Sequence, residues 1–393
     1  MNADLLCLSH LRWNVVHQRP RELMTRFAAR RRVYFLEEPV VGTGFPFLSV
    51  TRSDGVRILT PQLPRGIEGD DAEMLIRQLL RAHLREHGVI KPIHWFCTPM
   101  MQPIVDALPA AAIAFDCTDE LSVLAVAPPE LVAREQALLA RADVVFTGGH
   151  SLFERKRQSH PNVHAFPSSI DVEHFAQARR AVQEPDDQRH LLRPRIGFCG
   201  IVDERVDLRL IDAVARLRPY WQLVMIGPAT KVDSAAVPRA ANIHYLGMKS
   251  YDDLPRYLAG WDVAMLPYAR NDSTRYINPA KTPEYLAAGR PVVSTSVRDV
   301  VRPYGERQLV RIADTPEAFV AAVEHALVER APPPAVDAFL LASLSWDRTW
   351  AAMDRLLEAA VSRRAARAPR RPVSRLDPHP AAGAIDAQLT GEA

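Results

Sequence analysis

A lysine and a glutamate three residues apart, Lys281 and Glu284, lie in the segment of this chain best suited to binding an anionic ligand. Two short apolar runs, Val263–Pro267 and Pro291–Thr295, flank the segment, which therefore reads as strand, polar loop, short helix and strand. A cation, a carboxylate and free backbone N–H groups would meet there at the carboxyl end of a strand. This combination suits a sugar diphosphate, because Lys281 and the amides would bind phosphates and Glu284 would bind a ribose diol.

The start of the short helix in this segment has two possible positions. Asn278 would cap a helix with Pro279 in its first position, or Thr282 would do so with Pro283. The end is better defined, because Gly289 suits a left-handed residue after a helix and the proline two residues later cannot continue it. Either start places the carboxylate in or near the first turn.

The run PEYLAAGRPVVST resembles the donor-site signature of GT-B glycosyltransferases, especially the set called glycosyl transferases group 1. In that set a glutamate is followed five residues later by glycine and seven later by proline, as Glu284, Gly289 and Pro291 are here. The resemblance implies that Glu284 holds the ribose of a nucleotide sugar and that Lys281 serves the diphosphate. Many members carry a second glutamate eight residues upstream, where this chain has Tyr276, so retention and inversion at the anomeric carbon both stay open.

The resemblance also implies donor contacts from loops that follow other strands in the C-terminal half. The first of these loops, with Gly200 and Arg205, would touch the diphosphate, while Gly247 and Met248 would frame the base. Arg205 could instead belong to a solvated, self-paired helix start, and Met248 could be ordinary packing. The expected donor site comprises Gly200, Arg205, Gly247, Met248, Lys281, Thr282 and Glu284.

The N-terminal half is expected to hold the acceptor and a catalytic base. Asp116 and Asp119 cluster just past the end of a predicted strand, where a carboxylate could take the proton of an acceptor hydroxyl in an inverting displacement. In a retaining reaction the same group would position the acceptor, and Asp119 could otherwise simply cap a helix. His10, in a polar turn after the first strand, is the third candidate for contact with the sugar or acceptor.

Composition excludes several classes of function. A chain of 393 residues, 48% of them hydrophobic, is long enough to bury two hydrophobic cores. A net charge of +3 does not indicate a basic surface for nucleic-acid binding. No apolar run approaches the roughly 18 residues of a membrane span, and the N-terminus lacks a signal-peptide pattern. The four cysteines have no metal-type spacing, and Asp252–Asp253 resembles an acidic first turn of a helix. We therefore expect a cytoplasmic protein without a metal ion or other cofactor.

Strands alternate with helices in both halves of the chain, which favours parallel, doubly wound sheets. The resemblance implies the α/β class and the GT-B architecture. In it, two Rossmann-like β/α/β domains face each other across a cleft, and a C-terminal helix crosses back to the N-terminal domain. The expected parts are an acceptor domain at 1–175, a linker at 176–194, a donor domain at 195–344, the crossover helix at 345–361 and a disordered basic tail at 362–393.

The resulting expectation is a glycosyltransferase, of the hexosyltransferase type, that moves a sugar from a nucleotide-diphosphate sugar to an acceptor hydroxyl. Its setting would be the synthesis of cell-surface polysaccharide or glycolipid, with a glycan or lipid-linked acceptor and peripheral contact at the inner membrane surface. Two alternatives stay open. One is a nucleotide-sugar epimerase, which shares the two-domain architecture, and the other is a catalytically silent partner of another glycosyltransferase, which Tyr276 would suit.

Overall fold

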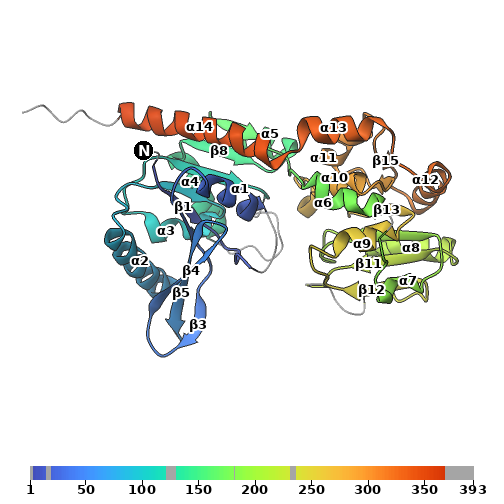
Figure 1. Ribbon diagram of the computed structural model, residues 1–393, viewed down its shortest axis with the longest axis horizontal. Coiled ribbons are helices and arrows are strands. Elements are labelled where there is room, and N and C mark those ends of the chain that lie inside the picture. Colours follow the sequence, from blue (N-terminus) through green and yellow to red (C-terminus); the bar gives the residue numbers. More distant parts are fainter. Residues whose placement is uncertain (1–2, 15–18, 121–129, 181, 231–235, 368–393) are drawn as a thin grey trace, which may run out of the picture.

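The computed structural model describes residues 3–14, 19–120, 130–180, 182–230 and 236–367. Within them the chain forms two α/β domains that lie side by side, each built on its own sheet (Figure 1). Helix α14 (Trp346–Arg367), at the C-terminal end of the described chain, returns to the N-terminal domain and runs along it. Among the helices of these ranges, none combines the length and the apolar character that crossing a membrane requires.

The N-terminal sheet has the order β3-β5-β2-β1-β6-β7-β8-β9, and β4 pairs antiparallel with β5. Its strands are β1 (Leu5–Leu8), β2 (Val33–Leu36), β3 (Val40–Thr43), β4 (Phe47–Ser53), β5 (Val56–Pro64), β6 (Ile93–Phe96), β7 (Ile113–Cys117), β8 (Val144–Thr147) and β9 (Val163–Ala165). Its helices are α1 (Arg19–Ala28), α2 (Gly69–Glu86), α3 (Gln102–Val105), α4 (Leu131–Arg141) and α5 (His150–Lys156).

The C-terminal sheet is wholly parallel, with the order β12-β11-β10-β13-β14-β15. Its strands are β10 (Arg195–Cys199), β11 (Gln222–Ile226), β12 (Ile243–Gly247), β13 (Val263–Leu266), β14 (Val292–Ser294) and β15 (Arg311–Ile312). The helices of this half are α6 (Val172–Ala176), α7 (Asp186–Arg189), α8 (Leu208–Leu217), α9 (Leu254–Ala259), α10 (Lys281–Ala287), α11 (Arg298–Val300), α12 (Pro316–Glu329) and α13 (Ala335–Ser343).

The central strands are buried along their whole length, as the parallel sheets require. Every residue of β1, β2, β6 and β8 is buried, because helices cover both faces of the sheet and leave no solvent face for polar residues. The predicted strands at 33–36, 93–96, 144–147 and 243–247 and the predicted helices at 208–217 and 316–329 are confirmed. The pair β3 and β4 was not predicted, since its apolar residues are interrupted by glycine, proline and polar residues.

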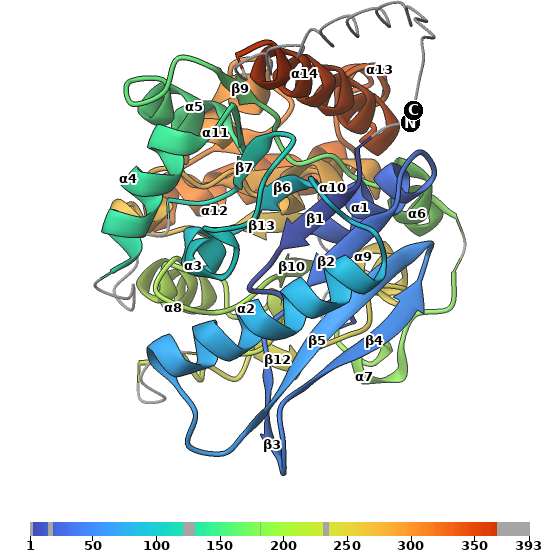
Figure 2. The ribbon, with the colours of Figure 1, turned by 90° about the vertical axis from the view of Figure 1, so that its left-hand side faces the viewer.

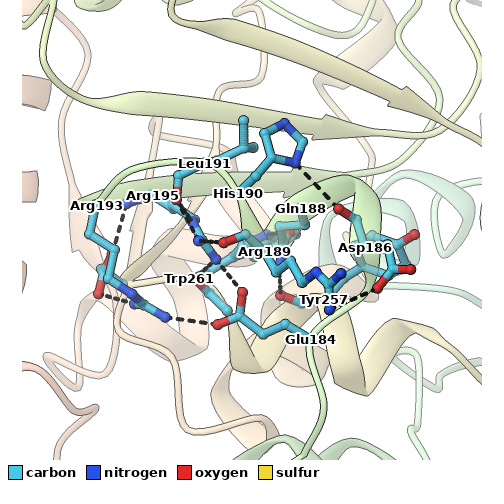
Figure 3. A network of polar contacts seen from close by, with 12 residues as sticks. Glu184, Asp186, Gln188, Arg189, His190, Leu191, Arg193, Arg195, Tyr257 and Trp261 are labelled. Carbon is cyan, nitrogen blue, oxygen red and sulfur yellow. Dashed lines mark hydrogen bonds and ion pairs between the residues drawn. The ribbon is translucent and has the colours of Figure 1, made fainter.

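The segment at 176–194, expected to be a polar linker, instead packs onto the C-terminal domain. Ala178 and Leu191 are buried in the core of that domain. Gln188 is fully buried; its amide nitrogen donates to the carbonyl of Tyr257 at 3.0 Å and its oxygen accepts from the Trp261 indole at 3.0 Å (Figure 3). The polar composition of this segment suggested a solvated linker, but its polar groups form hydrogen bonds with one another and with the domain rather than with water.

The chain passes between the two domains at two adjacent points. Ile170, on the way out, forms a parallel bridge with Ser345, on the way back, and its N–H donates to the carbonyl of Leu344 at 3.1 Å. Immediately afterwards α14 packs against α1, where the fully buried side chain of Arg31 pairs with Asp354 at 2.7 Å. The returning helix is therefore fixed to the N-terminal domain by an ion pair shielded from solvent.

Helix α14 is longer than the crossover helix expected at 345–361. It continues to Arg367, so residues 362–367 are helical rather than part of a disordered tail. Arg364 pairs with Asp143 at 2.8 Å, and alanine and arginine are strong helix formers, so the helix continues after its apolar contacts end. The remainder of the expected tail, 368–393, lies outside the described residues.

Removal of the Asp354 carboxylate should destabilise the N-terminal domain strongly. In Asp354→Ala the buried guanidinium of Arg31 keeps only its more exposed partner, Glu358, and we expect the free energy of unfolding to fall by about 3 kcal/mol in urea titrations. Asp347→Ala is the matched control on the same helix: that carboxylate is 80% exposed and pairs with Arg26, so the loss should stay below about 1 kcal/mol. Equal losses in the two variants would contradict this assignment.

Candidate functional site

Three glycines mark the carboxyl ends of β10, β11 and β12: Gly200, Gly227 and Gly247. A Cβ atom at Gly227, whose φ is +125°, would lie 2.0 Å from the carbonyl oxygen of Gly200. The backbones are joined here, since Gly200 donates to Ile226 and Gly227 donates to Gly247, both at 2.9 Å. Glycine is therefore required at 227, because a side chain there would collide with the backbone of Gly200. Sequence reasoning gave Gly200 and Gly247 a site role but did not single out Gly227, whose signal was a glycine directly after a buried strand.

Helix α10 begins differently from both expectations. Neither Asn278 nor Thr282 caps it; the residue before the helix is Ala280, in helical conformation. The amide of Thr282 donates to the carbonyl of residue 279 at 3.1 Å, and that of Glu284 donates to Ala280 at 3.3 Å. The proline between them has no N–H. The free amides expected for phosphate are therefore largely used within the helix, and the side chains of this segment must supply most of the binding.

Lys281 and Glu284 form an ion pair on α10, with Nζ and Oε2 2.7 Å apart. Their side chains are 25% and 11% exposed, so both are partly shielded but still reachable. Burial is the largest influence on the pKa of Lys281 and lowers it, but the charge of Glu284, its hydrogen bond and smaller effects of nearby groups together outweigh burial and raise this pKa. Burial also raises the pKa of the neighbouring Tyr268 to about 12. At neutral pH the segment therefore presents an ammonium group beside a neutral phenol.

The hydroxyl of Tyr285 fixes α10 to the end of β10. This fully buried tyrosine accepts a hydrogen bond from the N–H of Cys199 at 2.7 Å and donates to the carbonyl of the same residue at 3.2 Å. Gly289 follows the helix with a φ of +72°, which confirms the predicted left-handed end. Sequence reasoning missed the tyrosine's role, and the available signal was a hydroxyl in an otherwise apolar core helix.

Arg205 forms an ion pair with Asp203 in its own loop, and its charge also interacts with Asp119 of the other domain. Its guanidinium contacts the carboxylate of Asp203 at 2.6 to 3.1 Å. Hydrogen bonding to Asp203 is the main cause of a raised pKa for Arg205; burial acts against it, and the charge of Asp119 adds to it. Asp119 belongs to the N-terminal domain, so the arginine lies within electrostatic reach of the candidate base.

The other two predicted donor residues differ in their surroundings. Met248, directly after β12, is 68% exposed and does not pack into the core. Thr282 is fully buried, and its hydroxyl has no hydrogen-bond partner among the described residues. The structure therefore places Met248 on the exposed edge of the sheet and Thr282 beneath the surface.

Two predicted residues of the N-terminal domain meet at one cavity. His10 and Asp119 both line it, together with Cys97, Pro99, Phe115, Cys117, Thr118, Leu131 and Glu135. Burial lowers the pKa of His10, although the charges of Glu38 and Asp119 act in the opposite direction. Asp119 is exposed and accepts a hydrogen bond from the Thr118 hydroxyl at 3.1 Å. The cavity therefore combines an imidazole that favours its neutral form with an accessible carboxylate.

The buried ammonium group of Lys156 stabilises the loop that contains Asp119. Lys156 on α5 pairs with Glu120 and with Glu135, each at 2.8 Å, and its side chain is 5% exposed. Sequence reasoning did not single out this lysine, because only the tertiary fold brings its two carboxylates together. The pair with Glu120 holds the backbone next to Asp119 in place.

Asp116 is not available for acid–base chemistry at the cleft. Its side chain is 1% exposed, and both of its oxygens accept hydrogen bonds from Arg19 at 2.8 to 3.1 Å. Arg19 also donates to the carbonyl of Phe166 at 2.6 Å. The residue was expected just past the strand, but β7 continues through Cys117, so Asp116 lies within the sheet and has a structural ion pair.

The two domains touch where the turn after β8 meets the segment before α10. The amide of Asn278 donates to the carbonyl of Gly148 at 2.7 Å, and Asp299 accepts from the N–H of Ser151 at 3.0 Å. A Cβ atom at Gly149 would lie 2.1 Å from an Asp299 oxygen and 2.9 Å from the Cβ of Asn278. Glycine is therefore required for this approach, which sets the separation of the two candidate half-sites.

One further cluster of side chains contains residue types that can bind a metal ion. His83, Glu86 and His87, at the end of α2, place possible ligand atoms within 4.8 Å of one another. Two of the three residues are exposed, and α2 contributes nothing to the cavity or to the donor segment. The predicted acidic first turn at Asp252–Asp253 lies just outside α9, because the helix begins at Leu254 and Asp253 is the residue before it.

Comparison with known proteins gives this geometry a context. Residues 193–329 match the family model described as glycosyl transferases group 1. A putative teichuronic acid biosynthesis glycosyltransferase of Bacillus subtilis is 28% identical over 207 residues, 49% of this chain and 50% of that protein. The chain thus spans about half the length of this curated relative.

Solved structures extend the similarity to nearly the whole chain. Sucrose-phosphate synthase of Thermosynechococcus elongatus superimposes with a TM-score of 0.71 at 14% identity, covering 92% of this chain and 100% of that one. Anabaena HepE in complex with UDP and glucose gives a TM-score of 0.63 at 11% identity, covering 91% and 99%. The fold is therefore that of the GT-B glycosyltransferases, and the predicted fold class is confirmed. Within it, residues 193–329 of the C-terminal domain are the part that matches the group 1 glycosyl transferases.

Substitution of Gly149 should separate the two domains. In Gly149→Ala the added methyl group cannot fit between Asp299 and Asn278, so we expect a larger radius of gyration by small-angle X-ray scattering. Gly44→Ala is the control, because a Cβ atom there meets nothing within 4 Å. An unchanged radius in Gly149→Ala would show that the contact does not hold the domains together.

Proposed function

We propose that this protein is a glycosyltransferase that transfers a hexosyl group from a nucleoside-diphosphate sugar to an acceptor hydroxyl. The observation that carries the proposal is the Lys281–Glu284 pair, fixed by Tyr285 at the carboxyl edge of a sheet whose sequence matches the group 1 glycosyl transferases. Support for a uridine nucleotide comes from HepE, whose solved complex contains UDP and glucose.

On the donor side, positive charge would meet the leaving diphosphate. Lys281 and Arg205 would neutralise the charge that develops on its oxygens as the glycosidic bond breaks, an effect worth several kcal/mol in comparable sites. We propose that these two side chains serve in place of a metal ion, so that activity persists in EDTA. Glu284 uses Oε2 for Lys281, which leaves Oε1 to accept from a ribose hydroxyl.

On the acceptor side, the cavity with His10 and Asp119 would hold the attacking hydroxyl. Asp119 is the group that would take its proton in an inverting displacement, or orient it in a retaining one. His10 in its neutral form would accept or donate one further hydrogen bond to the acceptor.

We further propose a role in cell-surface polysaccharide or glycolipid synthesis at the cytoplasmic face of the membrane. The partners would be a nucleotide sugar and a glycan or lipid-linked acceptor. The Bacillus subtilis relative, which is named for teichuronic acid biosynthesis, supports this setting.

Nucleotide binding tests the donor site directly. Calorimetry against UDP, GDP, ADP and CDP should identify one nucleotide, which at a hundredfold excess over Kd stabilises the fold by about 2.7 kcal/mol in thermal denaturation. Lys281→Ala and Glu284→Ala should each weaken this binding by about ten- to a hundredfold, because each removes a charged hydrogen-bonding partner. Arg209→Ala, an exposed arginine on the neighbouring helix, should leave the affinity unchanged.

The outcomes separate the possible roles. Unchanged nucleotide affinity in both the lysine and the glutamate variants would show that the donor site lies elsewhere in the protein. Binding without any transfer or donor hydrolysis would favour a catalytically silent partner protein.

The role of Asp119 is tested by a pair of substitutions. With the donor that the nucleotide screen identifies, Asp119→Asn should lower kcat by about a hundredfold or more and leave nucleotide affinity intact, because an amide cannot accept the proton. Asp116→Asn should mainly lower the thermal stability, because it breaks the buried pair with Arg19. Full activity of Asp119→Asn would remove this residue from the mechanism.

A further inference from the structure

A three-stranded extension of the N-terminal domain carries unusually exposed apolar side chains. β4 pairs with β5 from Val56 to Gln62, β3 pairs with its outer end at Gln62–Pro64, and together the strands extend beyond the rest of the domain (Figures 1 and 2). Val41, Phe45 and Phe47 are 55%, 69% and 38% exposed, and the two rings lie 5.6 Å apart. Among the described residues, these are the only phenylalanines with exposed side chains. Such a pair on a narrow projection needs a partner that covers it.

The strands of this extension end on a cation, and carboxylates begin only beyond it, at Glu68, Asp70 and Asp71. We define the outer tip as residues 41–47 together with 63–66. It contains no acidic residue, and its single charged side chain is Arg65, whose Nε would lie 3.9 Å from a Cβ atom at Gly42. An apolar surface with a cation at its border suits the interface of an anionic lipid bilayer, where aromatic rings enter the headgroup region and arginine meets lipid phosphates.

The base of the extension adjoins the candidate acceptor side. Arg12 donates to the carbonyl of Pro39 at 2.9 Å, directly before β3, and Glu37 accepts from the N–H of Trp13 at 2.9 Å. These contacts tie the extension to the turn that carries His10, which lines the cavity with Asp119. Because β3 and β5 run parallel to β2, the outer tip projects from the carboxyl edge of the sheet, on the order of 15 Å beyond its base.

We propose that the outer tip inserts into the surface of an anionic bilayer and thereby presents the cavity at His10 and Asp119 to a membrane-embedded acceptor. The insertion itself rests on exposure and charge at the tip, whereas the delivery of the acceptor rests on the proposed function. A lipid-linked acceptor then keeps its apolar part in the bilayer while its head group reaches the cavity.

A second copy of the chain fits this surface less well. The exposed side chains of the tip amount to a few hundred Å², well short of the roughly 800 Å² that each partner contributes to a standard interface. A bilayer sets no such requirement, since a few inserted side chains combine with electrostatic attraction.

Vesicle binding tests the proposal with the full-length chain. Wild-type protein should co-sediment with vesicles of phosphatidylglycerol mixed with phosphatidylcholine, and Phe45→Ser/Phe47→Ser should bind them at least about tenfold more weakly. Val328→Ser is the matched control, because Val328 is 82% exposed on α12 of the other domain and should leave vesicle binding unchanged. Arg65→Gln should weaken binding to these vesicles but not to phosphatidylcholine alone.

UDP binding, measured on the same variants, separates the possible failures. Wild-type affinity for UDP in the double variant shows that the fold and the donor site are intact, so a loss of vesicle binding then belongs to the tip. Equal vesicle binding by the double variant and the wild type would overturn the proposal. So would a wild-type dimer that light scattering shows to dissociate in the double variant. Either result would leave the proposed glycosyl transfer untouched, whereas failure to bind any nucleotide would contradict that function alone.

Discussion

The buried pair between Arg31 and Asp354 is the interaction that holds helix α14, which follows the second crossing between the domains, to the N-terminal domain. The candidate site is divided, with His10 and Asp119 on one domain and the cationic donor segment on the other, so neither half is useful unless the halves are aligned. Helix α14 follows directly from the second crossing between domains, and the ion pair anchors it. Inside the protein an unpaired guanidinium is far more costly than a solvated one, so this anchor tolerates little variation.

The charges across the cleft are complementary before any ligand binds. The donor side carries Lys281 and Arg205, and each already has a carboxylate partner in its own domain. A bound diphosphate would therefore replace these carboxylates as the anionic partner of the two cations, rather than bind cations that have no partner. Asp119 adds negative charge from the opposite side and acts on Arg205. As negative charge develops on the leaving group, Lys281 and Arg205 would strengthen their contacts with it at the expense of their contacts with the carboxylates.

The sequence predicted the local framework of the site but not its tertiary partners. Glycine, proline and apolar runs locate the strands and the end of α10, because those signals act within a few residues. The roles of Asp116, Tyr285 and Lys156 depend on groups far away in the chain: Asp116 pairs with Arg19, and Tyr285 holds the backbone of Cys199. The segment at 176–194 was misread for the same reason, since a polar side chain such as Gln188 is as easily buried with a partner as left in solvent.

The double crossing has a consequence for the architecture as a whole. Ile170 and Leu344 are joined by a 3.1 Å hydrogen bond, so the intervening chain leaves and re-enters the N-terminal domain at one place. In covalent terms the donor domain is an insertion into a discontinuous host, whose last element is α14. A continuous piece with adjacent ends is the arrangement that permits circular permutation and exchange between relatives. The C-terminal domain can therefore be replaced as one continuous piece, while the N-terminal domain can be assembled only from two separate stretches of chain.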